Sequence, residues 1–227
     1  MKRLVWIAAI AILSVAIGLS WLSRRNTPPG PNPYEIIASL DLVHPGRGED
    51  RLSNGPADFD MSYAVFSSAA AIMADEARTK LGADFLVKSA AHNAKIGWRL
   101  PYPWDAFQDG SINPAETVYG INTANGVRAL IDAWGMTGDE RYKRTAIDAL
   151  DYYQEFRTKT DVGTFFWYSD QASDAIAVVN VTSLLMGQYA RAAALWGRND
   201  YRRIADEAFS EIWSQRKTSS EGMFWLY

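Results

Sequence analysis

Two stretches in the second half of this chain repeat one another at a constant distance. The helical matches pair each residue with the one 59 positions later: Tyr142 with Tyr201, Arg144 with Arg203, Ala146 with Ala205 and Ala149 with Ala208. The same offset relates two aromatic segments, GTFFWY at residues 163–168 and GMFWLY at residues 222–227. Chance rarely keeps one offset across two kinds of segment. The chain is therefore built from a copied supersecondary unit.

Two further matches extend the repeat. Trp134-Gly135 is matched by Trp196-Gly197 at an offset of 62, which a loop shorter by three residues explains. A fainter early copy is GWRLPY at residues 97–102, in the place of the aromatic segment. Apolar residues recur at steps of three and four, which is typical of helices. Each unit is predicted to run as an inner helix, a tight turn, an outer helix and an aromatic loop.

Helix boundaries follow from the pattern and from capping residues. The predicted helices are residues 61–81, 83–96, 113–134, 139–156, 175–196 and 201–213. Asn113 is predicted to cap the third helix, with Glu116 completing a capping box. Residues 135–138 should end that helix, and Asp139 should cap the next.

The fold class follows from the two kinds of helix in each unit. The first is apolar nearly all round, so it should be buried on both sides, and the second is amphipathic. We therefore expect an all-α fold, an incomplete α/α toroid of helical-hairpin repeats with its aromatic loops at one mouth. Six helices make three hairpins, whereas a full toroid has five to seven. We expect a half toroid, a toroid completed by another chain, or a truncated product whose exposed apolar end favours self-association.

The N-terminal segment indicates a membrane anchor. Residues 4–22 are uncharged and mostly Ile, Leu, Val and Ala, with basic residues on both sides. As a helix they would be about 28 Å long, close to the hydrocarbon thickness of a bilayer. We expect a transmembrane signal anchor at residues 1–25, with a cleaved signal peptide as the alternative. A proline-rich linker and loop at 26–56 would then hold a periplasmic helical domain, 57–227, outside the inner (cytoplasmic) membrane.

The composition excludes several classes of function. A net charge of −3 provides no basic stripe, so we expect no nucleic acid partner. The chain has no cysteine, which excludes disulfides, thiolate nucleophiles and cysteine-ligated zinc, and its two histidines cannot form a multi-histidine site. No P-loop, dinucleotide fingerprint or nucleophile elbow is present in the sequence. No metal or cofactor is expected.

Three stretches carry a resemblance to a known superfamily. They are GDERY at residues 138–142, Val179-Asn180 early in an inner helix, and the aromatic segment 222–227. Over roughly residues 114–227 the chain resembles the α/α-toroid carbohydrate-active superfamily of six-hairpin type, most nearly the C-terminal helical domain of glucuronyl C5-epimerases. The β-rich region that such epimerases carry before this domain is missing. With the anchor, the resemblance implies an exported protein acting on polysaccharide or uronic-acid-containing glycan, as a hydrolase, lyase or epimerase.

Two segments rich in polar and aromatic residues, 102–109 and 167–174, precede inner helices and should face one cavity. This mixture suits sugars, because aromatic rings stack on the apolar face of a sugar while carboxylates and amides bind its hydroxyl groups. The predicted substrate-binding residues are Tyr102, Trp104, Glu116, Tyr119, Asn122, Trp167, Tyr168, Asn180 and Tyr227.

The catalytic prediction depends on the reaction. A glycosidase needs two carboxylates that flank the scissile bond, and the candidates are Asp105 or Asp109 paired with Asp170 or Asp174. An epimerase or lyase needs a base beside the uronate carboxyl and a group that stabilises the resulting charge. The base candidates are Tyr102, Tyr168 and Tyr227, and the stabilising candidates are Asn122 and Asn180.

Structural roles compete with these assignments. Asp58, Asp60, Asp170 and Asp174 also fit helix caps or loop acids, Asn180 could bond a neighbouring loop, and the repeated Tyr142 and Tyr201 fit packing roles. For the whole chain, the alternatives are a non-catalytic periplasmic helical-repeat scaffold and a truncated pseudo-enzyme. An enzyme should gather at least two of the four candidate aspartates around one aromatic-lined pocket, whereas a scaffold should spread them along its rim.

Overall fold

The computed structural model describes residues 44–49, 52, 55–92, 94–220 and 222–225. Six α-helices lie in this part of the chain: α3 (Asp60–Ile72), α4 (Glu76–Ser89), α5 (Gly120–Thr137), α6 (Glu140–Tyr153), α7 (Val179–Trp196) and α8 (Asn199–Ser214). Short strands form four separate antiparallel pairs: β1 (Arg47–Gly48) with β2 (Ala57–Asp58), β3 (Ala91–His92) with β4 (Lys95–Ile96), β5 (Arg157–Lys159) with β6 (Thr164–Phe166), and β7 (Lys217–Ser219) with β8 (Gly222–Phe224).

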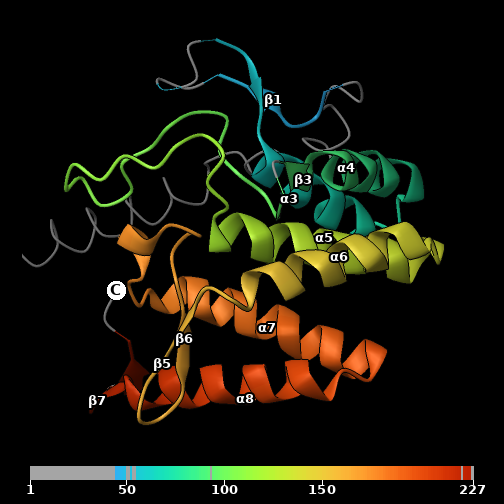
Figure 1. Ribbon diagram of the computed structural model, residues 1–227. Coiled ribbons are helices and arrows are strands. Elements are labelled where there is room, and N and C mark those ends of the chain that lie inside the picture. Colours follow the sequence, from blue (N-terminus) through green and yellow to red (C-terminus); the bar gives the residue numbers. More distant parts are fainter. Residues whose placement is uncertain (1–43, 50–51, 53–54, 93, 221, 226–227) are drawn as a thin grey trace, which may run out of the picture. The chain divides into compact units, whose positions relative to one another are not determined.

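The helices pack as three consecutive hairpins. Helix α3 pairs with α4, α5 with α6 and α7 with α8, while the first helices α3, α5 and α7 also pack on one another in that order. Figure 1 shows the hairpins in succession, from α3 and α4 to α7 and α8. The prediction of a helical fold made of inner helices backed by outer helices is confirmed for the described residues.

Several helix ends agree with the predicted caps. Gly138 and Gly197 follow α5 and α7 in the left-handed conformation, with φ of 70° and 68°, and each N–H bonds a carbonyl in the last turn of its helix. Glycine adopts this conformation without the steric cost that a Cβ brings. The Asp139 side chain accepts a hydrogen bond from the Arg141 N–H in the first turn of α6, as expected of an N-cap.

The predicted start of the third helix at Asn113 is wrong. Helix α5 begins at Gly120 with Tyr119 at its N-cap, so neither Asn113 nor Glu116 caps it. The preceding connector is instead extended, because Arg99 pairs with Val118 and Trp104 pairs with Asn113 in antiparallel bridges. Pairing at both points holds the backbone out of the helical region that local sequence alone would allow.

Other boundaries also differ from the prediction. The helix predicted over 61–81 is divided at Ala74, whose φ is +55°, and Asp75 then caps α4. The helix predicted over 83–96 ends at Ser89, because the next residues form the β3–β4 pair. Helix α7 begins at Val179, four residues after the predicted position, because a 3-10 turn, Ala172–Asp174, occupies the connector.

The aromatic segments form β-hairpins and not the loops that were predicted. Strand β6 contains residues 164–166 of the first segment and β8 contains residues 222–224 of the second, and each pairs with the strand before it. The β3–β4 pair likewise precedes residues 97–102. Each unit therefore runs as helix, helix and hairpin, and a connector leads from the hairpins of the first two units to the next inner helix.

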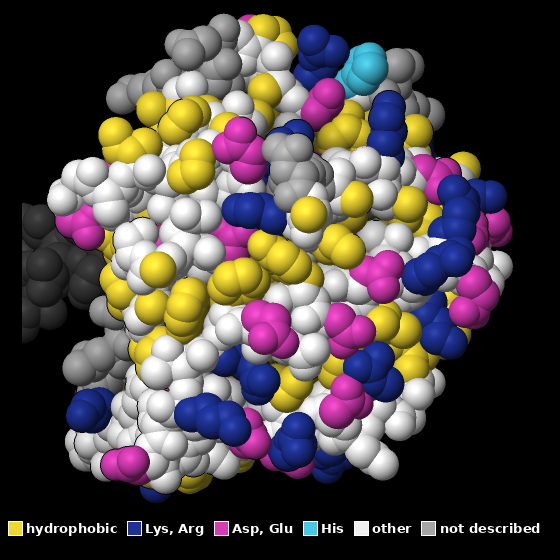
Figure 2. Space-filling view, viewed as in Figure 1, with side chains coloured by type: hydrophobic (Ala, Val, Ile, Leu, Met, Phe, Trp, Pro, Cys, Tyr) yellow, Lys and Arg dark blue, Asp and Glu magenta, His cyan; other side chains and the backbone are white. Residues whose placement is uncertain are grey.

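Repeated tyrosines link successive outer helices. Tyr142 on α6 donates a hydrogen bond to Asp84 on α4, and Tyr201 on α8 donates one to Asp151 on α6, over 3.0 and 2.7 Å. Both tyrosines are fully buried, which confirms their packing role. An arginine before each one also bonds the same aspartate. On the face shown in Figure 2, basic and acidic side chains lie interspersed over the helices.

The predicted anchor, the linker up to residue 43 and the residue Tyr227 lie outside the described residues. Among the residues described, no helix combines the length and the apolar character that crossing a membrane requires.

Candidate functional site

A cleft of about 420 Å³ lies where the connectors of two units meet the start of α7. We define the aromatic cleft by its lining residues, which are Trp104, Ala106, Phe107, Tyr168, Ala177, Val178, Val179 and Gln215. The two connectors are joined directly beside it. The Gly120 N–H donates to the Tyr168 carbonyl at 3.0 Å, and Tyr119 pairs with Ser169 in an antiparallel bridge. Backbone pairing therefore holds the two connectors together at the cleft.

Aromatic rings from both connectors pack around this junction. The Tyr168 ring centroid lies 5.1 Å from that of Phe107, 5.9 Å from that of Tyr119 and 6.2 Å from that of Trp104. Trp104, Phe107 and Tyr168 remain partly exposed, while Tyr119 is buried behind them. Burial raises the pKa of Tyr119 well above its ordinary value, so its hydroxyl stays protonated. The partly exposed rings offer flat apolar faces to a ligand.

Asp170 connects the segments around the cleft. Its carboxylate accepts hydrogen bonds from Tyr152 Oη at 2.9 Å, Gln171 Nε2 at 2.7 Å and the Val118 N–H at 3.3 Å. Lys95 Nζ lies 2.7 Å from its Oδ2, and the Asp170 side chain is only 2% exposed. A buried carboxylate that interacts with this many donors is held in place as a structural junction.

Asp174 is a second buried junction between the connectors. Its Oδ2 accepts hydrogen bonds from Asn113 Nδ2 at 2.7 Å and from Ser169 Oγ at 2.6 Å. The side chain is fully buried. Asn113 and Ser169 belong to different connectors, so Asp174 ties them together.

Asp105 and Asp109 shape the exposed loop next to Trp104. Asp105 accepts hydrogen bonds from the N–H groups of Asp109 and Gly110, and Asp109 accepts from the hydroxyl and the N–H of Ser111. The Ser111 bonds lower the pKa of Asp109. None of the four aspartates predicted as catalytic is among the cleft-lining residues. Their catalytic role stays a prediction.

The other predicted ligand residues are divided among several places. Trp104 and Tyr168 line the aromatic cleft, and Tyr119 packs behind them. Asn122 is buried and donates to the Arg99 carbonyl, while Trp167 Nε1 donates to Thr158 Oγ1 at 2.8 Å. Of the other four, Tyr102 packs on Phe59, Glu116 is exposed and Asn180 Oδ1 accepts from the Val181 N–H, while Tyr227 lies outside the described residues.

The structure also shows residues that the sequence reasoning missed. Phe107, Val178, Val179 and Gln215 line the aromatic cleft. The carboxyl group of Asp60, the first residue of α3, is buried and accepts a hydrogen bond from the Arg99 N–H at 3.1 Å. Burial raises its pKa to about 6. No group of three or more metal-ligating side chains is found among the described residues.

Comparison with known proteins identifies the fold. No family model and no curated protein matches the sequence. Among solved structures, an alpha-amylase from Clostridium perfringens is 14% identical with a TM-score of 0.60, over 88% of this chain and 60% of its own. An endoglucanase from Komagataeibacter sucrofermentans is 13% identical with a TM-score of 0.58, over 81% and 57%. A family 76 glycoside hydrolase (mannosidase) from Bacteroides thetaiotaomicron is 11% identical with a TM-score of 0.54, over 72% and 47%.

These similarities show the fold alone, because the sequence identities are low. The predicted α/α-toroid fold is therefore confirmed, whereas membership of the carbohydrate-active superfamily stays a prediction. The chain spans about half the length of the solved structures it matches. The closer resemblance to glucuronyl C5-epimerases stays a prediction.

Proposed function

We propose that this protein binds neutral polysaccharide at the aromatic cleft. One observation carries the proposal: rings from two connectors and one amide line a cavity of about 420 Å³ that has no charged side chain among its described lining residues. Cavities of this size suit small organic ligands or a short stretch of a chain. The apolar face of a sugar ring can stack on Trp104 or Tyr168, while its hydroxyl groups reach the polar atoms at the edge.

The charge of the cleft favours neutral sugars over uronic acids. A uronate carboxylate that enters an apolar site loses hydration, and a cation or several N–H donors must compensate for that loss. The lining residues include no Lys or Arg. Lys95, on the strand β4 near the connectors, is already bonded to Asp170. Of the glycans that the sequence suggested, we therefore favour neutral glucans and mannans, the kinds of polymer that the names of the structural neighbours also suggest.

Hydrolysis of the bound glycan is a second candidate function. It is favoured by the fold, which the chain shares with solved glycoside hydrolases. Two carboxylates must then flank the scissile bond, and one candidate is Asp105, in the loop that also carries the lining residues Trp104 and Phe107. Replacement of Asp105 by asparagine should abolish hydrolysis of a neutral oligosaccharide without abolishing its binding. Loss of binding together with hydrolysis would argue against this role.

We further propose that residues 1–25 anchor the protein in the inner membrane and that the helical domain lies outside the cytoplasm. The uncharged run and the proline-rich spacer support this. Protease added to spheroplasts should degrade the helical domain, whereas a cytoplasmic marker should survive. Protection of the domain in intact spheroplasts would refute the proposed orientation.

Calorimetric titration of the full chain tests the binding proposal. Cellohexaose, maltohexaose and α-1,6-mannohexaose represent neutral ligands, and hexagalacturonate represents an acidic one. At least one neutral ligand should bind more tightly than the uronate. Trp104→Ala should weaken that binding by about 1–2 kcal/mol, or roughly five- to thirtyfold in Kd. Trp213 is the matched control, because it is an exposed tryptophan on α8 that does not line the cleft. Tighter binding of the uronate, or equal losses in the two variants, would refute the proposal.

A further inference from the structure

The internal repeat identifies two residues that depart from their counterparts. The offset of 59 places Glu211 and Gln215 on the positions of Tyr152 and Phe156 in the preceding unit. There, the two aromatic rings pack 5.2 Å apart. The third unit has a carboxylate and an amide at the same positions. Because an aromatic pair suffices for packing at these positions, its exchange for a carboxylate and an amide points to a role other than packing.

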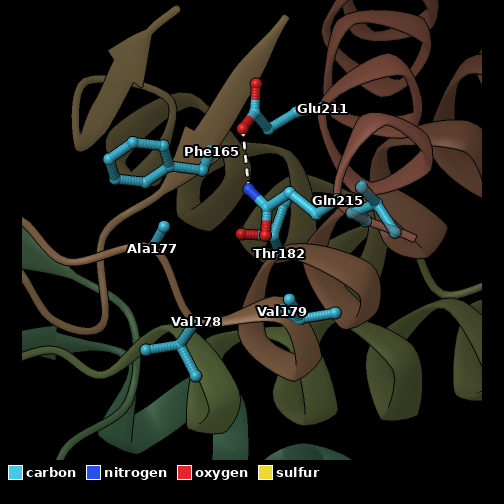
Figure 3. A pocket seen from close by; sticks show the side chains of 8 residues that line it. Phe165, Ala177, Val178, Val179, Thr182, Glu211 and Gln215 are labelled. Carbon is cyan, nitrogen blue, oxygen red and sulfur yellow. Dashed lines mark hydrogen bonds between the residues drawn. The ribbon is translucent and has the colours of Figure 1, made fainter. Parts of the chain in front are cut away.

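Glu211 holds the amide of Gln215 in one orientation. Gln215 Nε2 donates a hydrogen bond to Glu211 Oε1 at 2.7 Å, and Thr160 Oγ1 donates to Glu211 Oε2. Figure 3 shows the Glu211–Gln215 bond beside the start of α7, next to Val178, Val179 and Thr182. Glu211 is only 6% exposed. A carboxylate accepts hydrogen bonds, so the amide must turn its nitrogen toward Glu211 and its oxygen away.

Gln215 also lines the aromatic cleft. It borders both a small cavity of about 10 Å³, the size of a single water molecule, and the cleft itself. Among the described residues, no other hydrogen bond is formed by the side chain of Gln215, so its carbonyl oxygen and its second N–H can bind a ligand. This acceptor and this donor lie in one plane and match two neighbouring hydroxyl groups on a sugar ring. One hydroxyl can donate to the amide oxygen, and the other can accept from the amide N–H.

We propose that Gln215 selects the ligand of the aromatic cleft by hydrogen-bonding two adjacent hydroxyl groups of a neutral pyranose, and that Glu211 positions its amide. The inference rests on the proposed binding function and adds the specificity of the same site. The aromatic rings supply stacking that tolerates many sugars, whereas the amide distinguishes them by their hydroxyl pattern. Glu211 acts only through Gln215 and is a positioning residue.

Titrations of the full chain test this selectivity. The ligand is the neutral hexasaccharide that binds most tightly, and the probes are the methyl glycoside of its sugar and the 2-deoxy and 3-deoxy forms of that glycoside. The unmodified protein should bind at least one deoxy form about tenfold more weakly than the parent. Gln215→Leu should weaken the parent about tenfold and remove the difference between parent and deoxy form. Glu211→Gln should reduce this difference, because the new amide can face Gln215 in either orientation.

A matched control and a second variant make the outcome decisive. Gln154 follows α6 as Gln215 follows α8, at the C-cap of its helix, but does not line the cleft. Gln154→Leu should leave both affinity and discrimination unchanged. If Gln215→Leu still distinguishes the parent glycoside from its deoxy forms as the unmodified protein does, the inference is overturned. The proposed binding function is judged separately, by whether the unmodified protein binds the ligand. If Gln215→Leu does not fold, unchanged discrimination in Glu211→Gln overturns the inference instead.

Discussion

Replacing Gly126 by alanine tests how tightly the first aromatic segment packs under the inner helices. Gly126 lies within α5, and a Cβ built there would lie 2.3–2.6 Å from three ring carbons of Trp98. Carbon atoms in contact are normally about 3.5–4.0 Å apart, so the ring or the helix would have to move by about 1 Å. Trp98 is fully buried, and its Nε1 donates to the Leu86 carbonyl at 3.1 Å, which restricts that movement.

The two opposing effects can be compared in free energy. Alanine in place of glycine within a helix contributes about 1 kcal/mol of stability. Overpacking of a core costs about 1–3 kcal/mol, and overlap as close as this belongs at the upper end. Gly126→Ala should therefore lower the free energy of unfolding by about 2 kcal/mol. Gly135→Ala is the matched control on the same helix, because its Cβ would meet nothing within 4 Å, and it should raise the stability by up to about 1 kcal/mol.

Urea denaturation of the full chain measures both effects. The two variants should differ by about 3 kcal/mol in the free energy of unfolding, with the same dependence on urea concentration. Stability of Gly126→Ala equal to or above that of the unmodified protein would refute the close packing of Trp98 against α5.

Two other predictions concern stability. Burial raises the pKa of Asp60 to about 6, so the folded chain binds a proton more tightly than the unfolded chain. The stability that this proton contributes is fully present below the unfolded pKa of 3.8 and is lost, by up to about 3 kcal/mol, as the pH rises through about 6. Asp60→Asn should flatten that part of the pH profile. Tyr201→Phe and Tyr142→Phe should each cost about 1–2 kcal/mol in urea denaturation, since each loses a hydrogen bond to a carboxylate. Equal pH profiles for Asp60→Asn and the unmodified protein, or unchanged urea midpoints for both tyrosine variants, would contradict these two accounts.

The repeat predicted the helical architecture because it reflects local structure. Gly138, Gly197 and Asp139 end or begin helices through contacts within a few residues, and such signals are visible in a sequence. Tyr142 and Tyr201 repeat because each unit meets the preceding one in the same way. Periodicity could not distinguish a helix from the β3–β4 pair, whose pairing depends on the path of the chain.

The site residues were harder to predict because their partners are distant in sequence. Asp174 has the residue type of a helix cap, yet it bonds Asn113, which lies 61 positions earlier. No local pattern separates these two roles for an aspartate or an asparagine. Gln215 was detectable in principle, because the repeat places an aromatic residue, Phe156, at the equivalent position. Asp60 was visible only as a candidate cap, since its burial depends on the connector that contains Arg99.

A cross-linking measurement tests the central claim that two connectors meet in one ligand-binding cleft. The chain has no cysteine, so cysteines introduced at Ala106 and Ala177, both of which line the cleft, can be joined by a short bifunctional reagent without background. A control pairs Ala106→Cys with Ala194→Cys, which lies about 23 Å along α7 from its first residue. The account predicts intramolecular cross-linking of the first pair only, slowed by a bound neutral hexasaccharide. Equal cross-linking of both pairs, or no protection by any neutral ligand that binds, would contradict it.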